Sequence, residues 1–352
     1  MVQMSVDLSK LAVREQLDIG SLSGKVVAVD AYNVLYQFLS IIRQPDGSLL
    51  CDEKGNVTSH LSGLFYRSID LIAKGVNLVY VFDGMPSTLK KKTIEARISR
   101  REKAYEAWQK AVAEGQAEEV RKFAQASTRI TKEIVSSAKE LLGYMGIWYI
   151  NAPSEGEAQA SYMCSKGIAY AAASQDYDTL LFGSKKVVRN LTLSGRRKLP
   201  GKNVFVNVNP EMVDLDATLG SLGITRQKLI WIGILLGTDF NDGVKGVGPK
   251  TALKAVKSSN SITDIIEFAK QKFNYEFEVD PKDVEDLFMH PEVSEITEAE
   301  LGKGVSKSPD AEKIIHFMCA EHGFDEARVR KFSDVLKKAR GTSAQKGISS
   351  WM

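Results

Sequence analysis

Acidic residues follow several apolar segments of this chain and open one of its helices. The motifs "VVAVDA", "VYVFDG", "SQDYD" and "LLGTDF" each carry an aspartate at or just after an apolar run. Two glutamates flank a glycine in "APSEGEAQA", and the two aspartates of "SQDYD" have the i, i+2 spacing that would put them on one face of an extended segment. The seven acids are Asp30, Asp83, Glu155, Glu157, Asp176, Asp178 and Asp239.

Seven carboxylates gathered at one edge of a sheet would repel one another, and each would raise the pKa of its neighbours. Bound divalent cations would remove this conflict. Oxygen ligands without His or Cys indicate Mg²⁺ or Mn²⁺ rather than zinc, and the four histidines lack the H-E-x-x-H spacing. Two such ions about 3.5–4 Å apart are the usual arrangement for cleavage of a phosphodiester. The acids therefore predict a two-metal site for phosphodiester hydrolysis.

Each acid also has a purely structural interpretation. Ser154 and Glu157 stand at the S-x-x-E spacing of a capping box, in which each side chain would satisfy a backbone donor at a helix start. An aspartate that follows a strand is often a turn residue or the cap of the next helix. The spacing alone leaves both interpretations open.

The length and composition indicate a folded protein of about two domains. The chain has 352 residues, 43% of them hydrophobic, and a formal net charge of +3. Its longest apolar run, at 229–237, falls short of the roughly 20 residues that span a bilayer, and its start lacks a signal pattern. The three widely spaced cysteines suggest neither a disulfide framework nor a zinc site. We therefore expect an intracellular protein with no membrane association.

The pattern of apolar residues predicts the strands and helices that would position these acids. Apolar runs at 25–30, 77–83, 146–150 and 169–176 predict buried strands, and amphipathic helical patterns at 35–42 and 134–145 lie between them. This alternation predicts an α/β fold with a mainly parallel sheet, whose ligands bind at the carboxyl ends of the strands. A charged helical insertion is predicted from 95 to 113, with a break over 113–119 before a second helix. Helical patterns dominate after about 215.

Charge is concentrated in that insertion. The segment 90–132 holds 12 Lys and Arg against 6 Glu, which indicates a polyanionic partner.

Longer stretches resemble one family, the archaeal and eukaryotic flap endonucleases of the structure-specific 5′ nuclease superfamily. They are "DAYNVLYQFLSIIRQ", "TSHLSGLFYR", "YVFDG", "APSEGEAQA", "AAASQDYDTLLFG", "GILLGTDF" and "GVKGVGPKTA", in the family's order. The resemblance implies a PIN-like 5′ nuclease fold and places the family's metal-binding acids on the same seven residues. It also implies two Mg²⁺ ions, for which Mn²⁺ can substitute, and a catalytic role for Asp178.

The resemblance further implies a DNA-binding surface. The segment after Asp83 is similar to the family's helical arch, through or beneath which a 5′ flap passes, and Lys90 and Arg97 match the basic pair that contacts the scissile phosphate. Tyr36 matches an aromatic residue that stacks on a base beside the cut. Further DNA contacts fall on Arg43, Arg67, Arg100, Arg101 and Arg189.

The motif "GVKGVGPK" is similar to the turn of the family's helix–two-turn–helix element. Its backbone N–H groups at a helix start can hold a phosphate of the uncut duplex without reading sequence, with Gly246, Gly248 and Lys250 as the contacts. The resemblance also implies a K⁺ ion held by main-chain carbonyls of Gly243, Val244 and Val247.

The two ends of the chain carry further signals. The terminal "QKGISSWM" is similar to the peptide that binds a sliding clamp of the proliferating cell nuclear antigen type. At the start, "MVQMSVDL" places Ser5 where the family has a glycine near the active site. The clamp-binding residues would be Gln345, Ile348, Trp351 and Met352, the last in place of the usual second aromatic.

Taken together, the resemblance implies one 5′ nuclease domain over 1–330 in a monomeric protein. Its parts would be an N-terminal nuclease part (1–100), the arch (86–132), an internal nuclease part (133–260) with the helix–two-turn–helix at 225–260, and C-terminal helices (261–340), followed by a flexible tail over 341–352. The expected activity is two-metal cleavage at the base of 5′ flaps, with some 5′-3′ exonuclease activity, in Okazaki fragment maturation and base-excision repair. The alternatives are another 5′ nuclease, acting as exonuclease or junction resolvase, and a non-catalytic scaffold that binds DNA junctions.

Overall fold

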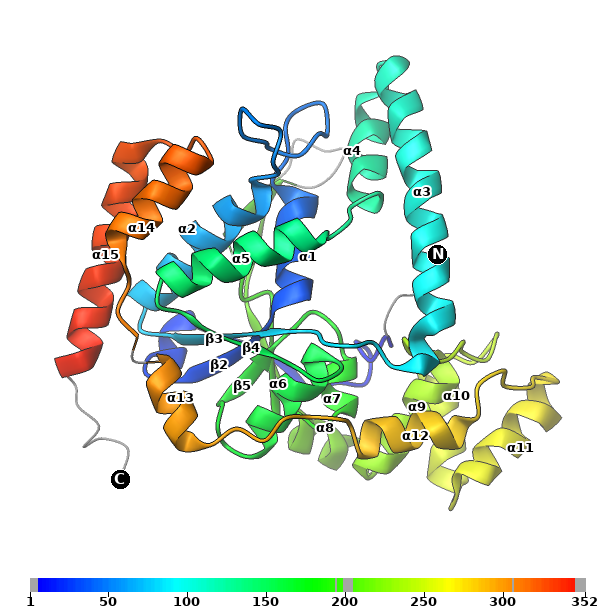
Figure 1. Cartoon of the computed structure of the whole chain (residues 1–352). Coiled ribbons are helices and arrows are strands. Elements are labelled where there is room, and N and C mark those ends of the chain that lie inside the picture. Colours follow the sequence, from blue (N-terminus) through cyan, green and yellow to red (C-terminus); the bar gives the residue numbers. More distant parts are fainter. Residues whose placement is uncertain (1–5, 194, 199–204, 306, 346–352) are drawn as a thin grey trace.

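The computed structural model describes residues 6–193, 195–198, 205–305 and 307–345, and its centre is a seven-stranded sheet in the order β1-β9-β6-β5-β2-β3-β4 (Figure 1). Five neighbouring strands, β6, β5, β2, β3 and β4, run parallel, whereas β9 is antiparallel to β6 and to β1. The predicted mainly parallel sheet is therefore confirmed. The strands are β1 (Arg14–Gln16), β2 (Val26–Asp30), β3 (Asn77–Phe82), β4 (Trp148–Asn151), β5 (Ala171–Ala173), β6 (Lys186–Arg189) and β9 (Glu211–Asp214).

Helices cover both faces of the sheet, which explains why its central strands are apolar throughout. All five residues of β2 are buried; Val27 and Val29 pack into one layer, and Val26 and Ala28 into the other. The first layer holds α1 (Ala31–Ile41), α2 (Ser59–Ala73), α5 (Lys132–Tyr144), α14 (Ala311–Ile315) and α15 (Glu326–Gln345); the second holds α6 (Gly156–Ser165) and α13 (Glu298–Val305).

A third apolar cluster lies beyond β6 and β9 and is made mostly of helices, as the pattern after residue 215 predicts. The helix α9 is buried along most of its length, from Leu229 to Leu235, and the other helices pack around it. These helices are α7 (Asp178–Leu181), α8 (Leu215–Leu222), α9 (Arg226–Leu236), α10 (Pro249–Ser258), α11 (Ile262–Phe273) and α12 (Pro281–Met289).

The basic insertion forms two helices that stand beside the sheet (Figure 1). A short 3₁₀ turn, η2 (Thr88–Lys90), leads into the long helix α3 (Lys91–Ala113), which packs against α4 (Ala117–Ala126). The turn between them contains Gly115, which has a φ of +68° that favours glycine. The predicted pair of helices is confirmed, and the break is shorter than expected.

Several elements differ from the sequence-based prediction. The strands β1, β6 and β9 and the hairpin β7 (Gly195–Lys198) with β8 (Phe205–Val208) were not predicted, because these short strands contain polar or charged residues and do not form the apolar runs that marked β2 to β5. The helix α15 ends at Gln345, so the predicted tail boundary at 341 is too early, and Ile348, Trp351 and Met352 lie outside the described residues. A remaining 3₁₀ turn is η1 (Ile19–Leu22), and η3 (His316–Glu321) is a π-helical turn. None of the described helices has the length and apolar character needed to cross a membrane.

Candidate active site

Three of the predicted acids lie at the carboxyl ends of adjacent parallel strands. Asp30 ends β2, Asp83 follows β3, and Asp176 follows β5, and β2 lies between the other two strands. The chain winds from β2 through β3 to β4 and then crosses back to β5, so its direction reverses at β2. This is the position at which open α/β sheets bind their ligands.

The start of α6 brings two more acids to the same edge. Glu155 precedes the helix, Glu157 lies in its first turn, and the Gly156 amide between them donates to Asp83 Oδ1 at 2.7 Å. A Cβ on residue 156 would lie 2.7 Å from that same oxygen. Any larger residue at 156 would therefore displace the Asp83 carboxylate from its present position.

The capping-box interpretation of Ser154 and Glu157 is wrong. The residue that caps α6 is Glu155, whose side chain makes no capping bond. The Glu157 carboxylate instead points to the sheet edge, where its Oε1 accepts hydrogen bonds from Ser174 Oγ at 2.8 Å and Thr179 Oγ1 at 3.3 Å. These two hydroxyl donors hold the carboxylate in its inward position.

Asp176 and Asp178 do not share an extended strand, contrary to the prediction from their spacing. The strand β5 ends at Ala173, Asp176 lies in the following turn, and Asp178 is the first residue of α7. The N-terminal segment also reaches this site, since the Val6 amide donates to Asp178 Oδ1 at 3.2 Å. Ser5, which the resemblance aligns with a glycine near the active site, lies outside the described residues.

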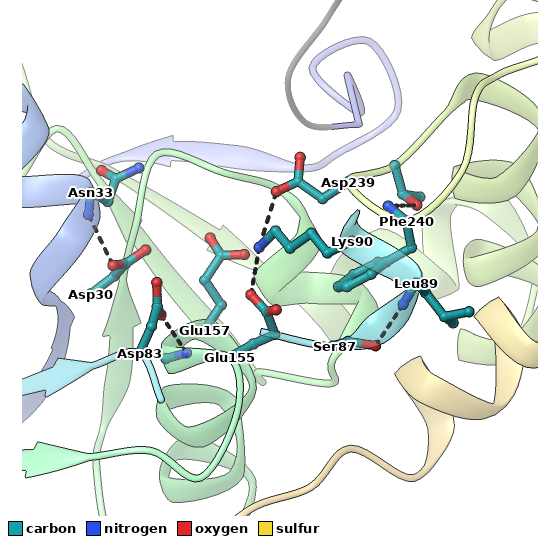
Figure 2. A network of polar contacts seen from close by, with 12 residues as sticks. Asp30, Asn33, Asp83, Ser87, Leu89, Lys90, Glu155, Glu157, Asp239 and Phe240 are labelled. Atoms are coloured by element: carbon teal, nitrogen blue, oxygen red, sulfur yellow. Dashed lines mark hydrogen bonds and ion pairs between the residues drawn. The ribbon is translucent and has the colours of Figure 1, made fainter. Parts of the chain in front are cut away.

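The cations come from the insertion (Figure 2). Lys90 Nζ lies 2.5 Å from Glu155 Oε2 and 3.3 Å from Asp239 Oδ2, and Figure 2 shows it between the two carboxylates. Arg97, two turns along α3, places Nη2 2.5 Å from Asp239 Oδ1. The base of the arch thus supplies two positive charges to a cluster of seven acids.

Burial and mutual repulsion control the charge of the acids. Burial, together with the charge of Asp83, raises the pKa of Asp30 to about 8, and burial together with Asp239 raises the pKa of Asp178 to about 8. The pKa of Asp83 rises to about 6, from burial and Glu155. The pKa of Glu157 is also raised, by burial and then by Asp176. Raised pKa values on several neighbouring carboxyls signal a site whose acids lack sufficient positive charge.

The same surroundings favour the charged form of Lys90. Burial alone would lower the pKa of its ammonium group, but Asp239 and Glu155 outweigh burial and raise the pKa. Lys90 therefore stays charged while it lies between these two carboxylates.

The donor set fits hard divalent cations, although it does not enclose one as it stands. Every predicted ligand is a carboxylate, and Glu155 Oε1 is buried without a hydrogen-bond partner. Among the described residues, no three His, Cys, Asp or Glu side chains converge closely enough to hold an ion. Lys90, held between Glu155 and Asp239, occupies part of the space where these oxygens could otherwise meet.

The residues predicted to bind flap DNA lie at the arch or on α1. The Arg101 guanidinium lies 5.8 Å from the centre of the Tyr36 ring, the Tyr36 hydroxyl donates to the Gln125 carbonyl at 3.5 Å, and Arg100 is exposed. Arg43 donates to the Gly47 carbonyl and to Thr128 Oγ1, each at 2.7 Å, and so ties the connection after α1 to the end of the arch.

The other predicted DNA contacts lie on different surfaces. Arg67 bonds Asp70 and the Leu191 carbonyl, and Arg189 bonds the Tyr177 hydroxyl at 2.5 Å. In the turn between α9 and α10, Gly246 has a φ of +92° and Gly248 caps α10, with Lys250 exposed in its first turn.

Three polar residues of the site escaped sequence reasoning. Asn33 donates its side-chain amide to Asp176 Oδ2 at 3.0 Å and its backbone amide to Asp30 Oδ1 at 3.0 Å, and so links two strand ends. Ser174 and Thr179 orient Glu157. All three stand inside the motifs "DAYN" and "SQDYDT", so their closeness to the acids was the available signal.

Known proteins match both the sequence and this geometry. The XPG N-terminal domain family matches residues 5–104, and the XPG I-region family matches residues 146–239. Flap endonuclease 1 of Pyrococcus horikoshii is 48% identical over 349 residues, covering 99% of this chain and 98% of the relative. Flap endonuclease 1 of Ignicoccus hospitalis is 49% identical over 330 residues, covering 93% and 91%.

The chain belongs to the flap endonuclease family.

Solved structures agree with this assignment. Flap endonuclease-1 from Methanococcus jannaschii superposes with a TM-score of 0.73 and 36% identity, covering 96% of this chain and 99% of that one. The catalytic core of Rad2 in complex with a DNA substrate has the same fold, with a TM-score of 0.65, 24% identity and coverage of 92% and 96%. As a member of the flap endonuclease family, the chain is a metal-dependent nuclease that hydrolyses phosphodiester bonds of DNA.

Proposed function

We propose that this enzyme cuts branched DNA at the base of a 5′ single-stranded flap and leaves a 5′ phosphate and a 3′ hydroxyl. One observation carries the proposal: two acids of the carboxylate cluster, Glu155 and Asp239, form ion pairs with Lys90 and Arg97 from the arch. A phosphodiester is an anion that acids alone would repel. A site for its hydrolysis needs this pairing of metal-binding acids with phosphate-binding cations.

The proposed cofactor is a pair of Mg²⁺ ions, for which Mn²⁺ can substitute, held by the seven acids. When bound, such ions supply activation of water at neutral pH and stabilisation of charge on the phosphate oxygens. Lys90 and Arg97 would exchange their carboxylate partners for the oxygens of the scissile phosphate. Because both side chains are mostly buried, their attraction for the phosphate is weakly screened by water.

Recognition of DNA shape would rest on contacts to the backbone. The turn of the helix–two-turn–helix, with Gly246, Gly248 and Lys250, would hold a phosphate of the uncut duplex, and Arg67 and Arg189 would contact the strands beside the cut. Tyr36, between α1 and the arch, would stack on an unpaired base. A K⁺ ion at the carbonyls of Gly243, Val244 and Val247 completes the proposed duplex site.

In the cell we expect a monomer that acts in Okazaki fragment maturation and base-excision repair. The terminal segment with Gln345, Ile348, Trp351 and Met352 would bind a sliding clamp of the proliferating cell nuclear antigen type, which keeps the nuclease at newly made junctions.

The experiment that tests the activity is cleavage of a 5′-labelled double-flap DNA in Mg²⁺, with Asp178→Ala and a plain nicked duplex as controls. A single product from just inside the downstream duplex, absent for the variant, is expected. Stepwise digestion of the nicked duplex would identify a 5′ exonuclease instead. Tight junction binding without cleavage in Mg²⁺ or Mn²⁺ would identify a non-catalytic scaffold.

A further inference from the structure

A second feature near the active-site edge is an open basic pocket between α1 and the start of α5. It has a volume of about 340 Å³, which lies within the range of small-ligand sites. Tyr32 of α1 forms one wall, and the start of α5 forms the other, with Lys132, Ser136 and Lys139. Ile130, just before α5, makes part of the apolar lining, and it lies in the segment that connects α4 of the arch to α5.

The pocket adjoins the carboxylate centre through Phe82. The Tyr32 ring meets the Phe82 ring edge-on at 6.3 Å between centroids, and Lys139 Nζ lies 4.7 Å from the centre of the same ring. Phe82 directly precedes Asp83, and Tyr32 lies two residues after Asp30. A ligand in the pocket would therefore lie next to the proposed position of the scissile phosphate.

The pocket carries the positive charges of Lys132 and Lys139. Glu133 is an acidic neighbour of Lys132: the pKa of its carboxylate is lowered by a hydrogen bond with Thr131 and further by the Lys132 charge. Lys132, Ser136 and Lys139 share one stripe of α5, whereas Glu133 and Glu140 lie on a neighbouring stripe, with the Glu140 carboxylate accepting from Tyr144. Among the described residues, neither lysine forms an ion pair. Burial also lowers the pKa of Lys139, as expected for a cation that is partly desolvated without an acidic partner.

Tyr32 and Tyr36 form an aromatic pair along α1. They are four residues apart, so their side chains project from the same face of the helix, one turn from each other. Tyr36 lies at the arch, below Arg101, and Tyr32 lies at the pocket. Aromatic rings at successive positions, with cations beside them, are the usual means of holding consecutive nucleotides of a single strand.

We propose that the pocket formed by Tyr32, Lys132 and Lys139 binds a nucleotide of the 5′ single strand next to the scissile phosphate. Tyr32 stacks on its base, and the two lysines hold its flanking phosphates. The proposal rests on the proposed function, because it assigns part of the same substrate. It makes the pocket a site for single-stranded nucleic acid, which a junction that lacks a 5′ branch would leave unused.

The experiment compares binding of two junction DNAs, one with and one without a 5′ single-stranded branch, by fluorescence anisotropy in EDTA over a range of salt concentrations. The pocket variant is Lys132→Gln/Lys139→Gln. The matched control is Lys25→Gln/Lys166→Gln, which removes two exposed lysines at the opposite edge of the sheet, before β2 and after α6. Lys132→Arg/Lys139→Arg keeps the charge and tests for rescue.

We expect the pocket variant to lose about tenfold or more in affinity for the branched junction only. Its salt slope should fall by about 1.4, because each phosphate contact to a single strand contributes about 0.7. The arginine variant should retain affinity, and Tyr32→Leu should lose about tenfold where Tyr32→Phe does not. Abasic nucleotides at successive flap positions should cancel the Tyr32→Leu effect at one position, which identifies the bound nucleotide.

Two results would overturn the pocket assignment: an equal loss on both junctions, or a pocket variant that behaves like the Lys25/Lys166 control. Either result is compatible with flap cleavage by the unaltered enzyme. Failure of the proposed function would differ, since the unaltered protein would then neither prefer the branched junction nor cut it in Mg²⁺.

Discussion

Five of the seven acids in the carboxylate centre accept hydrogen bonds from groups outside the arch, whereas the long helix α3 of the arch buries a single residue, Ala111. In the centre, backbone amides hold Asp30, Asp83 and Asp178, and hydroxyls hold Glu157. These donors belong to elements that pack into the core, so the acids are fixed before any ligand arrives.

The arch is held mainly at its contacts with one loop and α1. Trp108 Nε1 donates to the Asp46 carbonyl at 3.3 Å, Arg43 bonds Thr128, and Gly47 lies against Trp108, Val120 and Ala124. Elements with few buried contacts open at low free-energy cost. The carboxylate centre is therefore a rigid part of the site, whereas Lys90 and Arg97 belong to an arch that is held less strongly.

The largest expected effect comes from Asp178, where one substitution should lower the cleavage rate but raise the thermal stability. We expect Asp178→Asn to lower flap cleavage by about 10³-fold or more, since a proposed metal ligand is lost. The same change should raise the melting temperature in EDTA by about 2 °C, because it removes a buried carboxyl whose ionisation folding disfavours, as its raised pKa shows. Single-turnover cleavage and thermal unfolding measure the two effects. Asp216→Asn, on the exposed side of α8, should change neither.

Lys90 tests whether the arch supplies catalytic charge. We expect Lys90→Met to lower the cleavage rate by about 10²-fold, because the cation faces the proposed phosphate position. It should also lower the melting temperature in EDTA, since Glu155 and Asp239 lose their shared partner. Lys92→Met is the matched control, because Lys92 pairs with Glu278 at the exposed surface. Equal effects of the two changes would contradict the assignment of Lys90.

The pH dependence of stability tests the carboxylate centre by itself. The pKa is about 8 for Asp30 and Asp178 in the folded protein, against an ordinary 3.8 for an exposed aspartate. Between these values the folded chain binds more protons than the unfolded chain, so its free energy of unfolding must fall as pH rises. In EDTA, the melting temperature should therefore decline from pH 5 to pH 8.5. Mg²⁺ should reduce this decline, and Asp30→Asn/Asp178→Asn should flatten it.

The smallest expected effect concerns the arch contact at Gly47. A Cβ there would lie 2.9 Å from Ala124 Cβ and 3.1 Å from Trp108 Nε1, so Gly47→Ala should loosen the loop from the arch. Gly55→Ala is the control, because Gly55 has nearly the same φ, +83° against +82°, and nothing within 4 Å of an added Cβ. Faster proteolysis at the α3–α4 turn and a cleavage rate lowered a few-fold are expected for Gly47→Ala alone. Equal effects of Gly47→Ala and Gly55→Ala would show that backbone strain at a positive φ causes them, and that the contact of residue 47 with the arch does not.

Much of the centre could be predicted because its signals are local. An aspartate at the end of an apolar run, as in "VVAVDA", marks a strand end, and parallel strands bring such ends to one edge. The motif "APSEGEAQA" showed two acids at a helix start but not which way Glu157 points. That direction depends on Ser174 and Thr179, which reach it from another part of the fold.

The sequence by itself determined the residue types of the site, the buried parallel strands and the two charged helices of the arch, because these follow from short-range periodicity and composition. The tertiary structure alone decided which groups meet. Val6 reaches Asp178, Asn33 joins two strand ends, Lys90 lies between Glu155 and Asp239, and Tyr32 faces the basic stripe of α5. Such contacts join residues far apart in the chain, and their energies depend on burial and distance, which no local pattern of residues encodes.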